Sequence, residues 1–234
     1  LQDLLLAQLL DKAGEGLALA GLPQAETIRE IPLQIPLRIY SRDGRLVSEI
    51  GERRRILVTY DDVPEHVVHA FISAEDRRFF EHPGIDYIGV MRALFQLVTT
   101  GDVQAGGSTL TQQLARGYFL TADRTIERKL KEMILAVNIE HNYSKEEILL
   151  IYLSTVPFGE NTFGIRSASL LYFSKEPDLL RVEEAATLVG ILKANQTYNP
   201  VKHPEQAMKR RNTVLGLMAR AGYLEGNDSD SLQA

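Results

Sequence analysis

The sequence predicts a mainly α domain with a small β element near its N-terminal end. Two observations lead to this prediction. An Asp-Gly pair lies between two short alternating runs within residues 33–59, which is typical of a β-hairpin. From Asp62 onward, residues that begin helices precede apolar residues at helical spacing. With 234 residues, the chain can bury its own core, as one large domain or as two lobes that share a core.

The β element should be a hairpin whose strands lie near residues 37–40 and 46–50, on either side of the Asp-Gly pair. The apolar run at residues 56–60 is a candidate third strand. Before these strands, residues 1–22 read as a leucine-rich helix.

Helices occupy most of the remaining chain in this prediction, because capping patterns mark where they start. Helices should start at Asp62 with Glu65, at Ser108, and at Ser144 with Glu147. Further helices should cover Asp86 to about Val98, residues 123–142, about 182–193 and about 204–221. In the helix at 123–142 the apolar positions are Ile126, Leu130, Ile134 and Val137.

The composition excludes several classes of function. The chain contains no cysteine, which excludes disulfides, thiolate metal sites and cysteine nucleophiles. Its formal net charge of -5 argues against a general nucleic-acid binder. The apolar stretch at residues 4–10 is followed by charged residues and is too short to span a bilayer. We therefore expect any membrane anchor of the natural protein to lie outside this sequence.

Acidic and aromatic residues meet in the segment Glu75–Asp86, at the end of a predicted apolar helix. A carboxylate in such surroundings suits proton transfer. The same pattern also fits a solvated helix end followed by a turn at Pro83-Gly84, and the segment alone does not decide between the two.

A glycine-rich start precedes hydroxyl and amide side chains in the segment Gly106–Arg116. Glycines before a helix start leave backbone N–H groups free to meet an anion. The side chains of Thr109, Gln112 and Gln113 can hydrogen-bond sugar hydroxyls or phosphate, and Arg116 adds positive charge. A P-loop is excluded because its glycine–lysine spacing is absent, whereas an ordinary capped helix after a loop remains an alternative.

Two cations and a carboxylate share one face of the predicted helix at 123–142. Arg128 and Lys129 precede Glu132 by four and three residues, which places the three side chains on the same side. Two cations beside a carboxylate can grip a diphosphate, but a solvated, salt-bridged face is the alternative for such a pattern. The histidines show no metal-ligand spacing such as HExxH.

These segments occur together and in order, and with them the sequence resembles the family 51 peptidoglycan glycosyltransferases. That family comprises monofunctional enzymes and the N-terminal domains of class A penicillin-binding proteins. The motifs EDxxFxxHxG, GSTLTQQL and RKxxE match at Glu75–Asp86, Gly107–Leu114 and Arg128–Glu132, and KxxILxxYLN with a later FG matches within Lys145–Gly159. The likeness covers residues 33–224.

The resemblance also implies the organisation of the chain. It implies a lysozyme-like, two-lobed glycosyltransferase domain over residues 61–234, preceded by a hairpin linker at 33–60. Residues 1–32 then form a helical segment and linker in place of the membrane anchor. Two departures from the family stand out: Ser154 replaces an asparagine, and Asn195-Gln196 stand where Ala-Pro-Ser is common.

The reaction that the resemblance implies is the polymerisation of lipid II into β-1,4-linked glycan strands, with inversion and release of undecaprenyl diphosphate. By resemblance, Glu75 is the general base, and Glu132 is a second catalytic residue that orients the cations or assists departure of the leaving group. The side chains expected to bind substrate are Asp76, Phe79, His82, Ser108, Thr109, Gln112, Gln113, Arg116, Arg128 and Lys129. A divalent cation near Glu132, Mg²⁺ or Mn²⁺, is a candidate cofactor, and no organic cofactor is expected.

The expected partners are lipid II, the growing glycan strand, the membrane surface and other cell-wall synthesis proteins, but no nucleic acid. The domain should lie on the outer, periplasmic side of the bacterial cytoplasmic membrane. The candidates for an apolar membrane-facing patch are Met91, Leu94, Phe95, Leu97 and Val98, for which core packing is the alternative.

Two other functions stay open at this point. A lytic transglycosylase or lysozyme-like hydrolase needs one catalytic glutamate and no diphosphate grip, and the group of Arg128, Lys129 and Glu132 speaks against it. An inactive scaffold that binds cell-wall partners is the second alternative, because Ser154 departs from the family pattern and no anchor is found.

Overall fold

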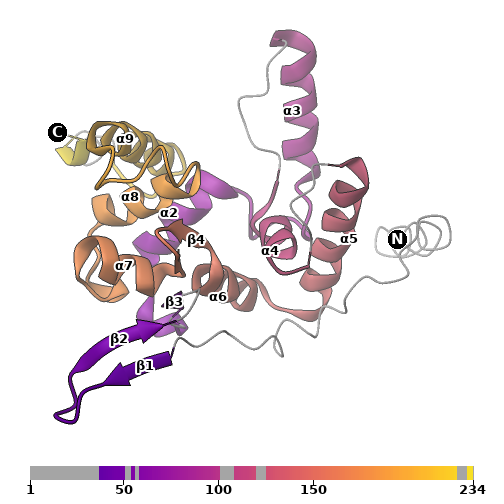
Figure 1. Ribbon diagram of the computed structural model, residues 1–234. Helices are drawn as coiled ribbons and strands as arrows, with labels where there is room; N and C mark the ends of the chain where they lie inside the picture. Colours follow the sequence, from indigo (N-terminus) through magenta and orange to yellow (C-terminus); the bar gives the residue numbers. More distant parts are fainter. Residues whose placement is uncertain are drawn as a thin grey trace. The chain divides into compact units, whose positions relative to one another are not determined.

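The computed structural model describes residues 37–50, 54–55, 58–100, 108–119, 125–225 and 231–233. It is mainly helical with a few short strands (Figure 1), which confirms the predicted fold class. The chain divides into two compact units. Unit 1 consists of the described residues in Phe80–Ile148, and unit 2 of those in Pro32–Phe79 and Leu149–Ala234. The predicted helix at residues 1–22 lies outside the described residues.

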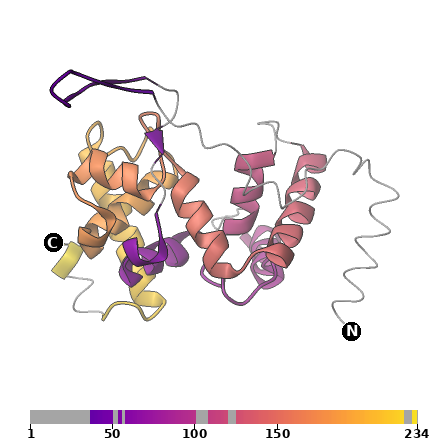
Figure 2. The ribbon, with the colours of Figure 1, turned by 90° about the horizontal axis from the view of Figure 1, so that it is seen from below.

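Unit 1 is built on two helices that pack together. Its described helices are α3 (Tyr87–Thr100), α4 (Leu110–Phe119), α5 (Ile126–Asn142) and the start of α6 (Lys145–Thr155). Helices α4 and α5 lie side by side in both views (Figure 1, Figure 2), whereas α3 extends away from them in Figure 1. The interface of α4 and α5 contains most of the buried apolar side chains of this unit, namely Leu110, Leu114, Ala115, Leu135, Ala136 and Ile139.

Two of the predicted helix caps in unit 1 are confirmed. Before α3, Asp86 Oδ1 accepts a hydrogen bond from the N–H of Gly89 at 3.0 Å. At the start of α6, Ser144 and Glu147 exchange hydrogen bonds of 2.9 and 3.2 Å, which is the expected capping box.

The cap of α4 is Thr109 and not the predicted Ser108. The hydroxyl of Thr109 accepts a hydrogen bond from the N–H of Gln112 at 3.2 Å. The hydroxyl of Ser108 instead accepts one from Lys129 on α5 at 2.7 Å. The two adjacent hydroxyl groups therefore have different roles, because a charged donor from a neighbouring helix engages the first one.

The buried face of α5 also differs from the predicted one. Of the positions expected there, Leu130, Ile134 and Val137 are only half-buried, and the side chain of Ile126 lies outside the described residues. The buried positions are Glu132, Leu135, Ala136 and Ile139. A turn of unit 1 explains the shift: Gly84 has a φ of +91°, and a Cβ there would lie 2.8 Å from the carbonyl oxygen of Ala136. Because the turn packs directly on this face, the helix buries it.

Unit 2 contains most of the other described helices and two small sheets. Its described elements include α2 (Glu65–Glu75), the rest of α6, α7 (Ile165–Phe173), α8 (Val182–Leu192), α9 (Pro204–Arg220) and the 3-10 helices η2 (Tyr60–Asp62) and η3 (Pro177–Leu179). Helices α8 and α9 pack on each other and on α2. The centre of the core is aromatic: Phe71 meets Tyr152 and Phe158 edge to face, with ring centroids 6.2 and 6.4 Å apart. The helices predicted near 182–193 and 204–221 are thereby confirmed.

Helix α2 begins without the predicted cap. It starts at Glu65 directly after Pro64, and no side chain caps it. The carboxylate of Asp62 accepts instead from the N–H and the hydroxyl of Thr59, at 2.7 and 2.9 Å. Both bonds go to Oδ2, so the carboxylate of Asp62 binds the residue before η2 and not the start of α2.

The strands form two separate sheets. As predicted, β1 (Leu37–Tyr40) and β2 (Leu46–Ile50) pair antiparallel in a hairpin. The prediction of a third strand at 56–60 is wrong for residues 58–60, which are not in a strand, and residues 56–57 lie outside the described residues. The additional strand is β3 (Arg54–Arg55), which pairs in parallel with β5 (Thr162–Phe163), and β5 pairs antiparallel with β4 (Pro157–Gly159).

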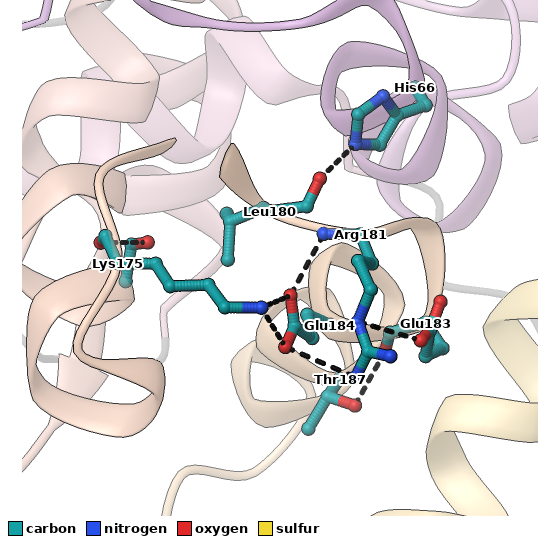
Figure 3. A network of polar contacts seen from close by, with 8 residues as sticks. His66, Lys175, Leu180, Arg181, Glu183, Glu184 and Thr187 are labelled. Carbon is teal, nitrogen blue, oxygen red and sulfur yellow. Dashed lines mark hydrogen bonds and ion pairs between the residues drawn. The ribbon is translucent and has the colours of Figure 1, made fainter. Parts of the chain in front are cut away.

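A polar network fixes the start of α8 in unit 2 (Figure 3). Glu184 accepts from the N–H of Arg181 at 2.9 Å and from Lys175 Nζ at 2.8 Å, and His66 Nε2 lies 2.7 Å from the carbonyl oxygen of Leu180. Burial by itself raises the pKa of the Glu184 carboxyl, but these hydrogen bonds outweigh burial and lower the pKa below its ordinary value. The charges of Lys175 and Glu184 are thus paired, and the network joins α2, the segment after α7 and the start of α8.

Candidate active site

The ammonium group of Lys129 is the centre of a polar group in unit 1. Its Nζ donates to Ser108 Oγ at 2.7 Å and to Gln112 Oε1 at 3.3 Å. It also forms an ion pair with Glu132 Oε1 at 2.5 Å. Ser108 and Gln112 belong to the second predicted motif, and Lys129 and Glu132 belong to the third. The structure therefore brings these two motifs together; we call these four residues the Lys129 group.

Glu132 is fully buried, yet one of its oxygens has no hydrogen-bond partner among the residues that the structure describes. The side chain of Glu132 is 0% exposed, whereas that of Lys129 is 37% exposed. Glu132 Oε2 is buried and accepts no hydrogen bond from the described residues. An unsatisfied buried polar atom costs about 1–3 kcal/mol, and more when the group is charged. Such an atom in a native fold calls for an explanation, and a bound ligand is one of the few available.

Arg128 adds a second cation with unmet hydrogen-bonding capacity. Its Nε is buried and has no partner among the described residues. Guanidinium groups bind phosphate oxygens through several N–H donors. The alternative of a solvated, salt-bridged face does not fit the full burial of Glu132. The arrangement instead suits an anion that would meet Arg128 and Lys129 beside a carboxylate.

The residues of the first motif fall into both units. In unit 2, Glu75 is the half-buried last residue of α2, Asp76 is its buried C-cap and Phe79 is fully buried. In unit 1, His82 is buried, and its Nδ1 accepts from the N–H of Gly84 at 3.2 Å. Because Phe79 is fully buried, its side chain packs in the protein interior. Contact of these residues with a substrate stays a prediction.

Other predicted residues lie on or before α4. Thr109 supports the Lys129 group, because its N–H donates to Gln112 Oε1 at 3.3 Å. Gln113 is half-buried, and Arg116 is exposed in the last turn of the helix. Their role in substrate binding stays a prediction.

The sequence analysis missed Glu140 and Thr111. Glu140 Oε1 accepts hydrogen bonds from Thr111 Oγ1 at 2.5 Å and from Lys145 Nζ at 2.8 Å. One signal could have revealed Glu140: it follows Glu132 by eight residues, which places both carboxylates on the same face of α5. Two carboxylates on one buried face need partners from elsewhere in the chain.

Helix α3 exposes a row of apolar side chains. The exposed ones are Tyr87, Ile88, Val90, Met91, Phe95 and Val98, of which Phe95 is 71% and Val98 78% exposed. Core packing is therefore the wrong alternative for Met91, Phe95 and Val98. The side chains of Leu94 and Leu97 lie outside the described residues. We call the exposed row the α3 face.

Two kinds of feature are absent from the described residues. In that part of the chain, no three His, Asp or Glu side chains come together as a metal-binding group. Nor does any described helix have the length and apolarity needed to cross a membrane.

The sequence matches a known family and longer curated proteins. The model of the family described as Transglycosylase matches residues 43–219. Penicillin-binding protein 1A of Escherichia coli (strain K12) is 44% identical over 209 residues, which are 89% of this chain and 25% of that protein. Penicillin-binding protein 1F of Bacillus subtilis (strain 168) is 41% identical over 205 residues, which are 88% of this chain and 29% of that protein. The chain spans about a quarter of the length of the curated relatives it matches.

The fold is similar to a solved structure. The 2.6 Å crystal structure of penicillin-binding protein 1A from Haemophilus influenzae matches with a TM-score of 0.50 and 24% sequence identity. The match covers 87% of this chain and 21% of that chain. At this level of identity the likeness concerns the fold alone.

Proposed function

The chain belongs to the transglycosylase family, and from this premise we propose that it polymerises lipid II into β-1,4-linked glycan strands of peptidoglycan. The observation that carries the proposal is the Lys129 group. In this group the ammonium of Lys129 pairs with the buried carboxylate of Glu132, and one residue earlier on the same helix Arg128 has a buried Nε that donates to no partner among the described residues. A diphosphate leaving group requires such a concentration of donors.

In the proposed reaction, the 4-hydroxyl of the acceptor sugar attacks the anomeric carbon of the donor. The new glycosidic bond forms with inversion as the bond to undecaprenyl diphosphate breaks. Glu75 accepts the hydroxyl proton as general base. The diphosphate leaves as an anion, so it needs charge stabilisation more than a proton, and Lys129 and Arg128 supply that stabilisation.

Glu132 keeps Lys129 in place for this step. Its Oε1 pairs with the ammonium group of Lys129, while Ser108 and Gln112 accept from the same nitrogen. Three acceptors fix the position of a flexible lysine side chain before substrate arrives. Preorganised charge of this kind is worth more than charge that must be reoriented during the reaction.

The proposed reaction includes a divalent cation, Mg²⁺ or Mn²⁺, that would be bound mainly by the phosphates of the substrate. Mg²⁺ in proteins is commonly bound by one or two carboxylates together with substrate phosphates. The unpartnered Oε2 of Glu132 fits a single carboxylate ligand of this type. When bound, the ion would supply further neutralisation of the diphosphate charge.

The Lys129 group argues against the hydrolase alternative. A lysozyme-like hydrolase cleaves a neutral glycosidic bond, so it has no use for two cations around a buried carboxylate. The family match does not favour the inactive scaffold either, because the residues of all four motifs are present except at Ser154.

The α3 face supports a location at the outer surface of the cytoplasmic membrane. Large contiguous apolar patches are unusual on the surface of soluble proteins and mark contact surfaces. Lipid II carries a long prenyl chain that stays in the bilayer, so its head group must be met at the lipid surface. We therefore propose that the α3 face contacts lipid, and that the growing glycan strand and other cell-wall synthesis proteins are further partners.

The proposed function is tested by incubating the protein with labelled lipid II in detergent and separating the products on a gel. A ladder of glycan strands is the expected result. Lysozyme should digest this ladder if the strands are β-1,4-linked. Shortening of a preformed glycan strand without any ladder from lipid II would instead indicate a hydrolase, and lipid II and strand both left unchanged would indicate a scaffold.

A further inference from the structure

Glu140 connects three segments of unit 1 that are distant in sequence. Its Oε1 accepts from the hydroxyl of Thr111 on α4 and from the ammonium group of Lys145 on α6. The side chains of Glu140 and Lys145 are only 7% and 19% exposed, and Thr111 is fully buried. A hydroxyl in this position has no water to bond with, so its bond to Glu140 fixes the first turn of α4 against α5.

The same lysine also fixes the turn that contains the end of the first motif. Lys145 Nζ donates to the carbonyl oxygen of His82 at 2.7 Å. Two residues further, the carbonyl oxygen of Gly84 accepts from the hydroxyl of Thr109 at 2.6 Å. A Cβ at Gly84 would also lie 3.1 Å from Glu140 Cγ, so the turn packs against the helix that carries Glu140.

Hydrogen bonds also lead from Gly84 in this turn to the Lys129 group. The hydroxyl of Thr109 donates to Gly84 and accepts from the N–H of Gln112. The N–H of Thr109 donates to Gln112 Oε1, which also accepts from Lys129 Nζ. Gln112 is therefore placed by the first turn of α4, and that turn is attached to α5 through Thr111.

We propose that Glu140, with Thr111 and Lys145, is a positioning residue that sets Gln112 and Ser108 at the right distance from Lys129 for diphosphate binding. The proposal rests on the proposed function, because it assigns these residues to the same reaction. Glu140 itself need not touch the substrate. It acts by keeping α4 in place, so that the acceptors of Lys129 come from one rigid helix start.

The test compares Thr111→Val with Thr111→Ser. Valine has the shape of threonine but cannot donate to Glu140, whereas serine can. Both are measured well below their melting temperatures, as turnover on lipid II and as calorimetric affinity for a phosphoglycolipid of the moenomycin type. Thr111→Val should lower both by about three- to tenfold, and Thr111→Ser should stay near wild type. The matched control is Glu127→Gln, which removes the exposed pair of Glu127 with Lys131 on the same helix and should change neither.

Three results would overturn the inference. Wild-type turnover and affinity in folded Thr111→Val would show that the bond to Glu140 serves stability alone. An equal loss in Thr111→Ser would show that the hydroxyl is not what matters. If Thr111→Val does not fold, Glu140→Gln replaces it, and undiminished turnover in that variant contradicts the proposal. A wild-type protein that forms no strands refutes the proposed function and this inference with it, whereas an active wild type with equally active variants refutes the inference alone.

Discussion

Two lysine–glutamate ion pairs in unit 1 differ in whether their buried carboxylate oxygens have hydrogen-bond partners. Glu140 Oε1 accepts from both Lys145 and Thr111, and neither side chain of the Glu140–Lys145 pair has a buried, unpartnered atom within the described residues. In the Lys129–Glu132 pair, Glu132 Oε2 is buried without a partner in the same part of the chain. Both glutamates lie on one face of α5, so the difference comes from their surroundings and not from the helix.

The difference teaches where to look for a function. A buried ion pair whose hydrogen bonds are all made stabilises a fold only if both partners stay in place. Removal of one partner lowers the free energy of unfolding by about 3–5 kcal/mol. A pair with unmet capacity contributes less to stability, but it is ready to bind something else. The same reasoning applies to apolar side chains, because those of the α3 face are exposed although they are large and apolar.

The largest expected effect lies outside both pairs. If the Lys129 group provides only charge stabilisation, the proton must be taken by another residue, and Glu75 is our assignment. Glu75→Gln should lower turnover on lipid II by about 10²–10⁴-fold with an unchanged circular dichroism spectrum. The matched control is Glu65→Gln at the exposed start of the same helix, which should keep full turnover. Near-normal turnover in Glu75→Gln would mean that the base is a different residue.

Removal of either cation should have the next largest effect. A charge-assisted hydrogen bond is worth about 1.5–3 kcal/mol, which corresponds to about 10- to 150-fold in affinity. Lys129→Ala and Arg128→Ala should weaken binding of a moenomycin-type phosphoglycolipid by this factor in calorimetry. Lys131→Ala, on the same helix but paired with the exposed Glu127, should leave the affinity unchanged. Unchanged affinity in both site variants would refute the diphosphate grip.

The next prediction tests whether the exposed apolar side chains of the α3 face bind lipid. Phe95→Ser together with Val98→Ser should lower liposome binding by about tenfold in a sedimentation assay, because both side chains are exposed and available to lipid. The melting temperature should change little, since neither side chain packs in the core. Val201→Ser is the control, because Val201 is equally exposed, at 79%, but lies in unit 2. Equal liposome binding in all three proteins would place the lipid contact elsewhere.

The smallest effect is expected at Ser154. Its Oγ accepts from the N–H of Val58 at 3.5 Å, which is a long and weak hydrogen bond at a buried position. Asparagine, the usual residue of the family, reaches further and offers more hydrogen bonds. Ser154→Asn should therefore raise the melting temperature by about 2–4 °C, as measured by calorimetry. A lower melting temperature would show that the pocket has no room for the amide.

Local signals in the sequence predicted much of the fold. The hairpin at 37–50 and the capping box of Ser144 with Glu147 depend on residues close together in the chain, and both are formed. The prediction was wrong where a distant partner decided the outcome. Ser108 was expected to cap α4, but Lys129, 21 residues away, engages its hydroxyl. The strand β3 is only two residues long and exists because β5, more than 100 residues later, pairs with it.

The candidate site was predictable to a similar degree. The spacing of Arg128, Lys129 and Glu132 placed them on one face, the amide side chain after a glycine-rich start indicated Gln112, and the motif resemblance added Ser108. Burial could not be predicted, because a glutamate on an amphipathic helix is usually solvated. The role of Glu140 depends on Thr111, which lies 29 residues earlier, and no local pattern connects the two.

The most direct test of the account is a comparison of thermal unfolding in Glu132→Gln and Glu140→Gln. Glutamine at 140 leaves Lys145 buried without its charge partner, so the melting temperature should fall by roughly 5–10 °C. Glutamine at 132 removes a carboxylate whose second oxygen accepts no hydrogen bond from the described residues. Lys129 is 37% exposed and can be hydrated, so the melting temperature should stay within about 2 °C of wild type. An equal and large loss of stability in both variants would contradict the claim that the Lys129–Glu132 pair serves function rather than folding.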